Sequence, residues 1–440
     1  MLLASKTNKM EHMRIHIRNY GCSTNQADGE ALAGCLTQAG FTLTSSVSAA
    51  DLIVYNTCAV KGPTENRIIS AIKRTPKNKK IIVAGCLPLI NFNRLSREAH
   101  FDAVVGPAAA EEIVNVVHRV LSGEQIIAIK DALTNKPPLD IPRLRTNSEI
   151  SIIPISYGCL GKCAYCCVTF ARGNLRSYTI NEIVARVQKD LSGGVREFWL
   201  TSQDTACYGW DIGTNLAELL FALTSIDADF RLRVGMMTPN TVAPLLADLL
   251  DAFGDERIFK FVHLPVQSGD NAVLRRMHRF YTVEDFKNIV NAFKTAFPNI
   301  TLATDIICGF PGETQTAFQH TLELVQETRP DIINISKFFP RPRTVAAEMR
   351  SEFLPLQEIK KRSTRVAALA KRISLECNKR WVGWKGDVLI DEKGKISGSW
   401  IGRNFAYKPV VVNSQLNLLG KFVTVEITKV FPTYLAGKLC

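Results

Sequence analysis

The sequence has no long hydrophobic run. No apolar stretch approaches the ~20 residues that a membrane-spanning helix needs, so we expect no membrane segment. The first fifteen residues also lack the apolar central region of a secretory signal. On this basis we expect a cytoplasmic protein.

Disulfide bonds are not expected either, although the chain contains twelve cysteines. The cytosol keeps thiols reduced, so cysteines of an intracellular chain more often serve metal or redox chemistry than a disulfide framework. We therefore examine the cysteines as possible ligands.

Acidic residues are outnumbered by basic ones. The chain has 54 Lys and Arg against 41 Asp and Glu, a formal charge of +13. This excess favours a polyanionic partner such as a nucleic acid, and a merely basic surface is the alternative. A length of 440 residues suggests roughly three domains, at about 150 residues each.

Three cysteines lie on one loop in a CxxxCxxC spacing. Cys159, Cys163 and Cys166, which we call the central triad, directly follow the apolar, strand-like segment 151–156. A [4Fe-4S] cluster normally takes four thiolates, so three leave one iron free to bind another molecule. The spacing therefore predicts a cluster with an open corner. Using Cys167 in place of Cys166 would break that spacing.

A second set of three cysteines lies in the N-terminal part. Residues 13–125 alternate strand-like and helical segments, which predicts a doubly wound parallel sheet. Cys22, Cys58 and Cys86, the N-terminal triad, each directly follow one of the first three strands. Because carboxyl ends of parallel strands share one edge, we expect these thiols on one rim. The alternative is core packing, which we expect for Cys35.

The central part of the chain predicts a barrel. Residues 131–148 contain three prolines and mark a linker. Strand candidates then alternate with helical segments, which suggests a full or partial barrel with its active site at the carboxyl ends of the strands. The six candidates are 151–156, 196–201, 231–236, 260–265, 301–307 and 332–338.

The C-terminal part combines positive charge with aromatic residues. A Lys/Arg-rich helical segment at 354–380 leads into short strand-like runs that predict a small antiparallel β-barrel. Basic grooves with stacking aromatics hold single-stranded or looped RNA. The predicted RNA contacts are Lys385, Trp400, Arg403, Tyr407 and Lys408.

These patterns together predict an α/β chain of four parts. They are an N-terminal doubly wound parallel sheet at 13–130, a central partial (β/α)6 barrel at 148–345, a basic helical connector at 346–379 and a small antiparallel β-barrel at 380–440.

Motifs from the N-terminal and central parts resemble those of one enzyme family. The matching tracts include Asn19-Tyr-Gly-Cys-Ser-Thr-Asn25, Asn56-Thr-Cys58, Gly158-Cys-Leu-Gly-Lys-Cys-Ala-Tyr-Cys166, His263-Leu-Pro-Val-Gln-Ser-Gly269 and Thr304-Asp-Ile-Ile-Cys-Gly-Phe-Pro-Gly-Glu-Thr314. The central part resembles radical S-adenosylmethionine enzymes, and the last part resembles a TRAM domain. The whole chain is similar to the methylthiotransferase family.

Residues within and after the central triad resemble one branch of that family. They are the Leu-Gly-Lys between the first two cysteines and the tract 171–178. The similar branch is archaeal and eukaryotic. It methylthiolates C2 of N6-threonylcarbamoyladenosine at position 37 of tRNA, next to the anticodon.

The resemblance implies two [4Fe-4S] clusters and S-adenosylmethionine as radical source and methyl donor. The central triad would hold the radical-generating cluster. The reaction needs this cofactor because no side-chain base can take hydrogen from C2 of adenine. The N-terminal triad would hold the auxiliary cluster, which carries the sulfur. Tyr165 would lie near the adenine of the cofactor. By their loop positions, Gln203 and Asp305 are further candidates for cofactor contacts.

Several alternatives remain open at this point. A methylthiotransferase of this kind can act on isopentenyladenosine in tRNA or on a ribosomal-protein aspartate, and a non-enzymatic iron-sulfur protein that binds RNA is the third option. Cys167, Cys207 and Cys308 lie on the same barrel face and compete as ligands. As partners we expect the tRNA anticodon stem-loop, an electron donor and a sulfur source, and we expect a monomer.

Overall fold

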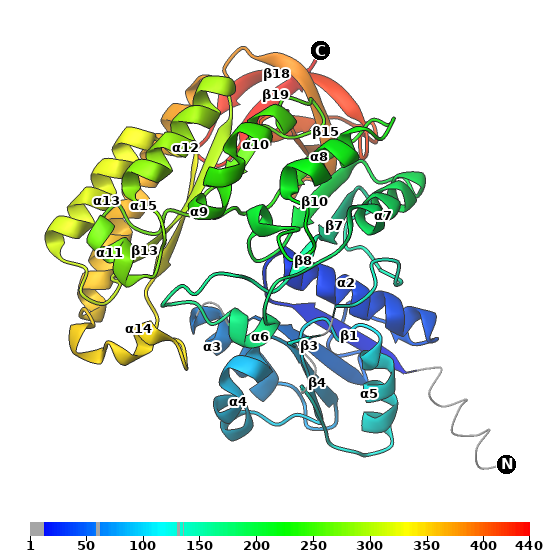
Figure 1. The fold of residues 1–440 in the computed structure, drawn as a ribbon. Helices are drawn as coiled ribbons and strands as arrows, with labels where there is room; N and C mark the ends of the chain where they lie inside the picture. The colour runs from blue at the N-terminus through cyan, green and yellow to red at the C-terminus, as the bar shows by residue number, and fades with distance from the viewer. Residues whose placement is uncertain (1–12, 59–61, 130–132, 135) are drawn as a thin grey trace.

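The computed structural model describes residues 13–58, 62–129, 133–134 and 136–440. Figure 1 shows three bodies along the chain: an N-terminal sheet (blue), a central set of strands and helices (green and yellow) and a C-terminal barrel (red). The N-terminal and C-terminal bodies lie at opposite ends of the central one.

The N-terminal body is a six-stranded parallel sheet in the order β2-β1-β3-β4-β5-β6. Its strands are β1 (Arg14–Asn19), β2 (Thr42–Leu43), β3 (Leu52–Thr57), β4 (Lys80–Gly85), β5 (Ala103–Val105) and β6 (Ile126–Ala128). Its helices are α2 (Ser23–Gln38), α3 (Gly62–Lys73), α4 (Leu87–Glu98) and α5 (Glu112–Leu121).

Both faces of this sheet are covered by helices. Side chains alternate along a strand, so Leu52 and Val54 of β3 pack with α2 and α5 on one face. Ile53 and Tyr55 pack with α3 and α4 on the other. The predicted doubly wound parallel sheet is confirmed.

The central body is a partial barrel of six parallel strands. They form two groups, β7-β10-β11 and β12-β13-β14, joined by an isolated parallel bridge between Leu232 and Ile258. Within the described residues the end strands β7 and β14 do not pair. The strands are β7 (Ile150–Pro154), β10 (Glu197–Thr201), β11 (Arg231–Val234), β12 (Phe261–His263), β13 (Thr301–Cys308) and β14 (Ile332–Lys337).

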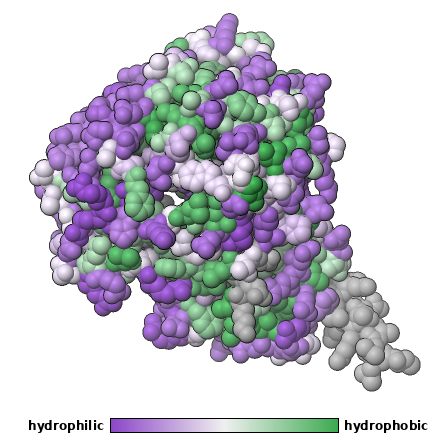
Figure 2. Space-filling model, in the orientation of Figure 1, coloured by the Kyte–Doolittle hydropathy of each residue, from purple (hydrophilic) through white to green (hydrophobic). Residues whose placement is uncertain are grey.

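Helices between these strands surround the barrel. They are α7 (Ile180–Ser192), α8 (Leu216–Thr224), α9 (Pro239–Val242), α10 (Leu246–Ala252), α11 (Asn271–Arg276), α12 (Val283–Ala296) and α13 (Gln315–Thr328). Their side chains and those of the strands form the largest buried hydrophobic cluster of the chain. The helices at the left of Figure 2 present a mainly hydrophilic outer surface.

A long helix, α15 (Leu356–Lys379), leads into a closed five-stranded barrel. The barrel strands are β15 (Lys385–Lys393), β16 (Ser399–Arg403), β17 (Pro409–Asn413), β18 (Phe422–Val430) and β19 (Leu435–Leu439). All neighbouring pairs are antiparallel except β17 with β19, which is parallel. The small barrel expected from the sequence is therefore present, with this one parallel pair as a difference.

The C-terminal barrel docks at the amino ends of the central strands. Lys408 Nζ donates to Asp331 Oδ1 at 2.8 Å, and Asp331 immediately precedes β14. The Tyr407 ring lies 4.9 Å from the Phe259 ring, just before β12. The carboxyl ends of the central strands therefore face away from this barrel.

Helix α2 places the start of the N-terminal domain at those carboxyl ends. Ala27 of α2 packs with Ile150 and Ile152 of β7. Thr24, in the first turn of α2, lies 3.1 Å from Thr201 between their Oγ1 atoms, and Thr201 ends β10. Cys22 immediately precedes α2, so it lies on the same side of the molecule as the loop of the central triad.

Among the helices of the described residues, none has both the length and the apolar character needed to cross a membrane.

Candidate active site between two cysteine triads

The central triad lies on the loop between β8 (Ser156–Tyr157) and α6 (Thr169–Arg172). Gly161 keeps the space between two thiols open, because a Cβ there would lie 3.2 Å from Cys159 Sγ and 3.7 Å from Cys163 Sγ. The Gly161 N–H donates to Cys159 Sγ at 3.2 Å, and the Val168 N–H donates to Cys166 Sγ at 3.5 Å. Thiolate ligands with such donors suit an iron-sulfur cluster.

Burial disfavours ionisation of two of these thiols, Cys159 and Cys166. It raises the pKa of Cys159 to about 11, against the opposing hydrogen bond from the Gly161 N–H. Burial also raises the pKa of Cys166 well above its ordinary value. Because thiolates are the metal-binding form, loading a cluster here releases protons.

A buried arginine, Arg279, contacts the remaining thiol of the central triad, that of Cys163. Arg279 Nη1 donates to Cys163 Sγ at 3.3 Å. The same guanidinium donates to Pro265 O at 3.1 Å and to the Tyr281 hydroxyl at 3.0 Å, which fixes its orientation. Sequence reasoning missed Arg279, because no spacing relates it to the cysteine loop.

The N-terminal triad lies at the carboxyl ends of three adjacent strands. Cys22 precedes α2, Cys58 directly follows β3, and Cys86 lies between β4 and α4. Burial raises the pKa of Cys86 to about 12; the Arg172 charge opposes this rise, and the Cys58 and Cys22 thiolates contribute to it. The three thiols are thus close enough for their charges to interact. Within the described residues no three His, Cys, Asp or Glu side chains are arranged for a single metal ion.

A buried amide network orders the backbone around this triad. Asn25 Nδ2 donates to Asn56 Oδ1 at 2.7 Å, and Asn56 Nδ2 donates to Asn19 Oδ1 at 2.9 Å. Gly85 has φ +93°, and a Cβ there would lie 2.4 Å from Thr57 O. The loop before Cys86 therefore requires glycine.

Arg172 and Asp28 join the two domains between the triads. Arg172 Nη2 donates to Asp28 Oδ2 at 2.6 Å, and the Tyr157 hydroxyl donates to Asp28 Oδ1 at 2.9 Å. The two members of the ion pair are almost completely buried. Figure 1 shows α6 and β8 between the N-terminal sheet and the central strands.

The predicted cofactor contacts lie in different surroundings. Tyr165, inside the central triad, packs edge-on against Phe310. Gln203 follows β10, and its buried Oε1 has no hydrogen-bond partner within the described residues. Asp305 Oδ1 accepts hydrogen bonds from His263 Nε2 at 2.9 Å and Asn334 Nδ2 at 2.7 Å.

The competing cysteines are packed into hydrophobic cores. Cys167 lies in the cluster that covers α3 and α4, Cys308 lies in the barrel core, and Cys207 is 1% exposed. The Cys167 thiol is held near the Arg341 guanidinium, which opposes the rise in its pKa caused by burial.

The predicted RNA contacts are mostly inaccessible. Lys385 is exposed, with 63% of its side chain accessible. Trp400 is 8% exposed in the core of the small barrel, and Arg403 Nε donates to Asp391 Oδ2 at 3.1 Å. Tyr407 and Lys408 pack against the central barrel as described above. We correct the expectation for these four residues, because they stabilise the small barrel and its docking.

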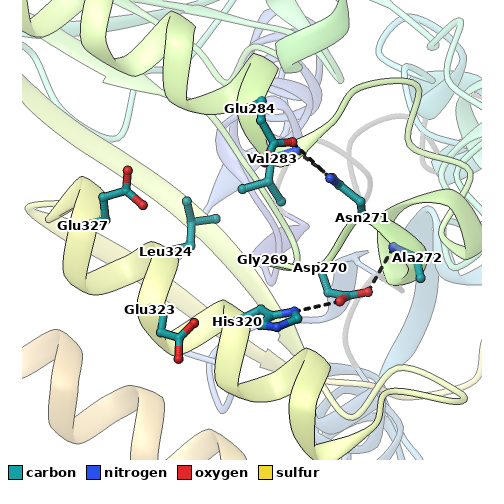
Figure 3. Close-up of a pocket in the computed structure, with 10 residues that line it drawn as sticks. All are labelled: Gly269, Asp270, Asn271, Ala272, Val283, Glu284, His320, Glu323, Leu324 and Glu327. Atoms are coloured by element: carbon teal, nitrogen blue, oxygen red, sulfur yellow. Dashed lines mark hydrogen bonds and ion pairs between the residues drawn. The ribbon is translucent and has the colours of Figure 1, made fainter.

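A pocket of about 370 Å³ lies outside the triads. It is lined by Asp270, Glu284, His320, Glu323 and Glu327, with other residues of α11, α12 and α13 (Figure 3). His320 Nδ1 lies 2.9 Å from Asp270 Oδ2. None of the cysteines or predicted cofactor contacts lines it, so it is separate from the candidate active site.

Three family models match separate parts of this chain. The Radical SAM superfamily matches residues 153–325, Uncharacterized protein family UPF0004 matches residues 14–106, and the TRAM domain matches residues 379–440. These matches coincide with the central barrel, the N-terminal sheet and the small barrel.

Relatives match over nearly the whole chain. A probable threonylcarbamoyladenosine tRNA methylthiotransferase of Pyrococcus horikoshii is 42% identical, over 97% of this chain and 99% of the relative. The protein of that kind from Archaeoglobus fulgidus is 41% identical with the same coverage. The human threonylcarbamoyladenosine tRNA methylthiotransferase is 38% identical, over 97% of this chain and 74% of its own.

Solved structures share the fold at low identity. The radical S-adenosylmethionine methyltransferase TsrM of Kitasatospora setae has a TM-score of 0.56 and 13% identity, over 77% of this chain and 75% of its own.

Proposed function

This chain belongs to the threonylcarbamoyladenosine tRNA methylthiotransferase family, and we propose that its two cysteine triads hold two clusters with separate tasks. The chain is a radical S-adenosylmethionine enzyme that methylthiolates threonylcarbamoyladenosine in tRNA. It uses S-adenosylmethionine and [4Fe-4S] clusters. We place the methylthio group at C2 of the adenine of nucleotide 37.

The placement of α2 carries the assignment of tasks. Its first turn meets the carboxyl end of β10 through Thr24 and Thr201, so Cys22 and the central loop share one face. We assign the radical-generating cluster to the central triad and the sulfur-carrying cluster to the N-terminal triad. When bound, the clusters and S-adenosylmethionine supply hydrogen abstraction from carbon and a sulfur atom, chemistry that side chains lack.

The chain's own residues bind and orient these groups. The backbone N–H groups of Gly161 and Val168 and the Arg279 guanidinium donate to thiols of the central triad. The unpartnered Gln203 Oε1 is an acceptor suited to an amino or hydroxyl group of S-adenosylmethionine. Tyr165 would contact the adenine of S-adenosylmethionine. Asp305 is the third candidate for a contact with S-adenosylmethionine, and hydrogen bonds from His263 and Asn334 orient its carboxylate.

An exposed basic stripe on α15 supports a path for the tRNA. Lys361, Arg365, Arg372 and Lys379 are exposed and spaced i, i+4, i+11 and i+18, which puts them on one helix face. The stripe is about 27 Å long at 1.5 Å per residue. Glu358 and Glu376 flank it, but each is paired with an arginine.

This stripe connects the two ends of the central barrel. Near the start of α15, Arg362 Nη1 donates to Glu313 Oε2 at 2.7 Å, in the loop that follows β13. Near its end, Asn378 accepts a hydrogen bond from Lys408 of the small barrel. We propose that the phosphates of the anticodon stem follow the stripe and that the loop reaches the triads. A tRNA substrate also favours a cytoplasmic enzyme, which we propose to be monomeric.

Nucleoside analysis of tRNA tests the proposed function. In a strain deleted for this gene, 2-methylthio-N6-threonylcarbamoyladenosine should disappear and its precursor N6-threonylcarbamoyladenosine should accumulate, as measured by mass spectrometry. The parent gene should restore the product, and a Cys159→Ala gene should not. Persistence of the product at its normal level would show that the substrate is a different one, such as isopentenyladenosine or a ribosomal-protein aspartate.

A further inference from the structure

Arg172 carries a buried hydrogen-bond donor without a protein partner. It ends α6 on the central side of the domain boundary and is 3% exposed. Nη2 donates to Asp28, while Nη1 is buried and has no hydrogen-bond partner within the described residues. Buried hydrogen-bond donors nearly always have an acceptor, and a buried donor without one lowers the stability of the fold. The unused N–H group therefore indicates a missing acceptor.

The surroundings of Arg172 fix the direction of its guanidinium. Asp28 lies on α2, six positions after Cys22, and accepts hydrogen bonds from both Arg172 and Tyr157. The guanidinium also lies over the Tyr157 ring, 5.7 Å from its centroid. With Nη2 held by the carboxylate, Nη1 has little freedom to find another partner.

The N-terminal triad lies close enough to Arg172 for their charges to interact, and a cluster there would supply the acceptor. The residue before Arg172, Ala171, packs in the same buried cluster as Cys86 and Leu87, because α6 contacts α4. Arg172 is the charge with the largest effect on the Cys86 thiol, and it also interacts with Cys22. A buried cation therefore faces thiols that must become anionic to bind iron.

We propose that Arg172 Nη1 donates a hydrogen bond to the cluster held by the N-terminal triad, and that its charge makes this cluster easier to reduce. The inference rests on the proposed function, which places a cluster there. Hydrogen bonds to cluster sulfurs and the net charge around a cluster set its reduction potential. A residue of the central domain thus controls the electronic state of a cluster held by the N-terminal domain.

A purely structural role for the Arg172–Asp28 pair makes a different prediction. It would explain the joining of the two domains but would leave Nη1 without an acceptor. Under that role, substitutions at either residue would change stability without moving the potential of the cluster. A shift of the cluster potential in the Arg172 variants, in the negative direction, therefore separates the two explanations.

The test uses the full chain loaded with only one cluster. Cys159, Cys163 and Cys166 are all replaced by alanine, and the midpoint potential of the remaining cluster is measured by electron paramagnetic resonance during redox titration. Arg172→Gln should move the midpoint to more negative values, because a cation that favours the reduced state is lost. Arg172→Lys should move it less. Asp28→Asn should move it to more positive values, because an anion is lost.

Tyr157→Phe is the matched control. It removes one hydrogen bond from the same Asp28 carboxylate without changing charge, so the midpoint should stay at the parent value. An unchanged midpoint in Arg172→Gln, or a shift of Arg172→Gln and Asp28→Asn in the same direction, overturns the proposal. If Arg172→Gln does not fold, Arg172→Lys decides, and an unchanged midpoint in that variant overturns the proposal. Absence of any cluster in the parent instead contradicts the proposed function.

Discussion

Arg279 Nη1 lies 3.3 Å from Cys163 Sγ, although 116 residues separate the two in the sequence. The guanidinium is buried and is held by the Pro265 carbonyl and the Tyr281 hydroxyl. Together with Arg172, it gives each cysteine triad one buried arginine. Residues that support metal ligands in this way commonly matter almost as much as the ligands.

Replacing Arg279 should impair the radical-generating cluster. Arg279→Gln removes a charged donor to a ligand sulfur, and we expect cleavage of S-adenosylmethionine to fall about 10–100-fold. Formation of 5′-deoxyadenosine by the reconstituted, chemically reduced protein measures this. Arg275→Gln, an exposed arginine of the same segment, is the control and should retain parent activity. Equal cleavage activity of the two variants would show that Arg279 does not support the radical-generating cluster.

Substitutions in the two triads should affect the two reactions differently. Cys22→Ala should abolish methylthiolation but leave cleavage of S-adenosylmethionine detectable, because cleavage belongs to the central triad. Cys159→Ala should abolish both reactions. The two products are quantified in parallel by mass spectrometry after anaerobic reconstitution. Equal loss of cofactor cleavage in the two variants would contradict the separate tasks of the clusters.

Neutralising the α15 stripe should weaken tRNA binding in a salt-dependent way. Each phosphate contact contributes about 0.9 to the slope of log K against log salt on B-form DNA, and about 0.7 on single strands. Arg372→Gln with Lys379→Gln should therefore lower the slope by up to about 2. Fluorescence anisotropy with labelled tRNA across salt concentrations measures it.

The matched control for the stripe lies at the amino ends of the N-terminal strands. Arg74 and Lys77 are exposed in the connection between α3 and β4, away from the cysteine rim. Replacing both by glutamine changes net charge equally but should leave the slope nearly unchanged. The same slope in the two double variants would exclude the stripe as the tRNA path.

Lys408 should matter for stability. Lys408→Met leaves Asp331 paired with Arg380, at 3.0 Å, but deletes its buried lysine partner. Breaking a buried pair costs about 3–5 kcal/mol, and we expect the lower end because Arg380 remains. Urea unfolding of the variant measures this loss. Lys385→Met, at an exposed position, should change stability by less than about 0.5 kcal/mol.

Stability should fall as pH rises because of Glu197. Burial, and next the Asp391 carboxyl across the docking surface of the small barrel, raise the pKa of Glu197 above its ordinary value of 4.5. Below that value both folded and unfolded states hold the proton. At higher pH the unfolded chain releases it first, so unfolding becomes more favourable until the folded carboxyl also ionises.

Glu197→Gln isolates this effect. The amide keeps an acceptor for Trp199 Nε1, which donates to Glu197 Oε1 at 2.5 Å, but it does not titrate. Between about pH 5 and pH 8 the free energy of unfolding should fall less in the variant than in the parent. If the free energy of unfolding falls equally with pH in the two proteins, the pKa of Glu197 is not raised by folding.

Much of this protein follows from local patterns in its sequence. Strand and helix alternation predicted the doubly wound sheet and the partial barrel, and the fold confirms both. The positions of Cys22, Cys58 and Cys86 after successive strands predicted a common edge, because parallel strands end at the same rim. The CxxxCxxC spacing indicated the central cluster, since one loop supplies all three thiols.

Contacts between distant segments were decided only by the tertiary structure. Arg172 and Asp28 are 144 residues apart, and no short-range period links them. Trp400, Arg403, Tyr407 and Lys408 suggested RNA contacts by composition, yet they lie in the small barrel or against the amino ends of the central strands. Composition does not say which face of a domain is buried, because burial depends on what the domain docks against.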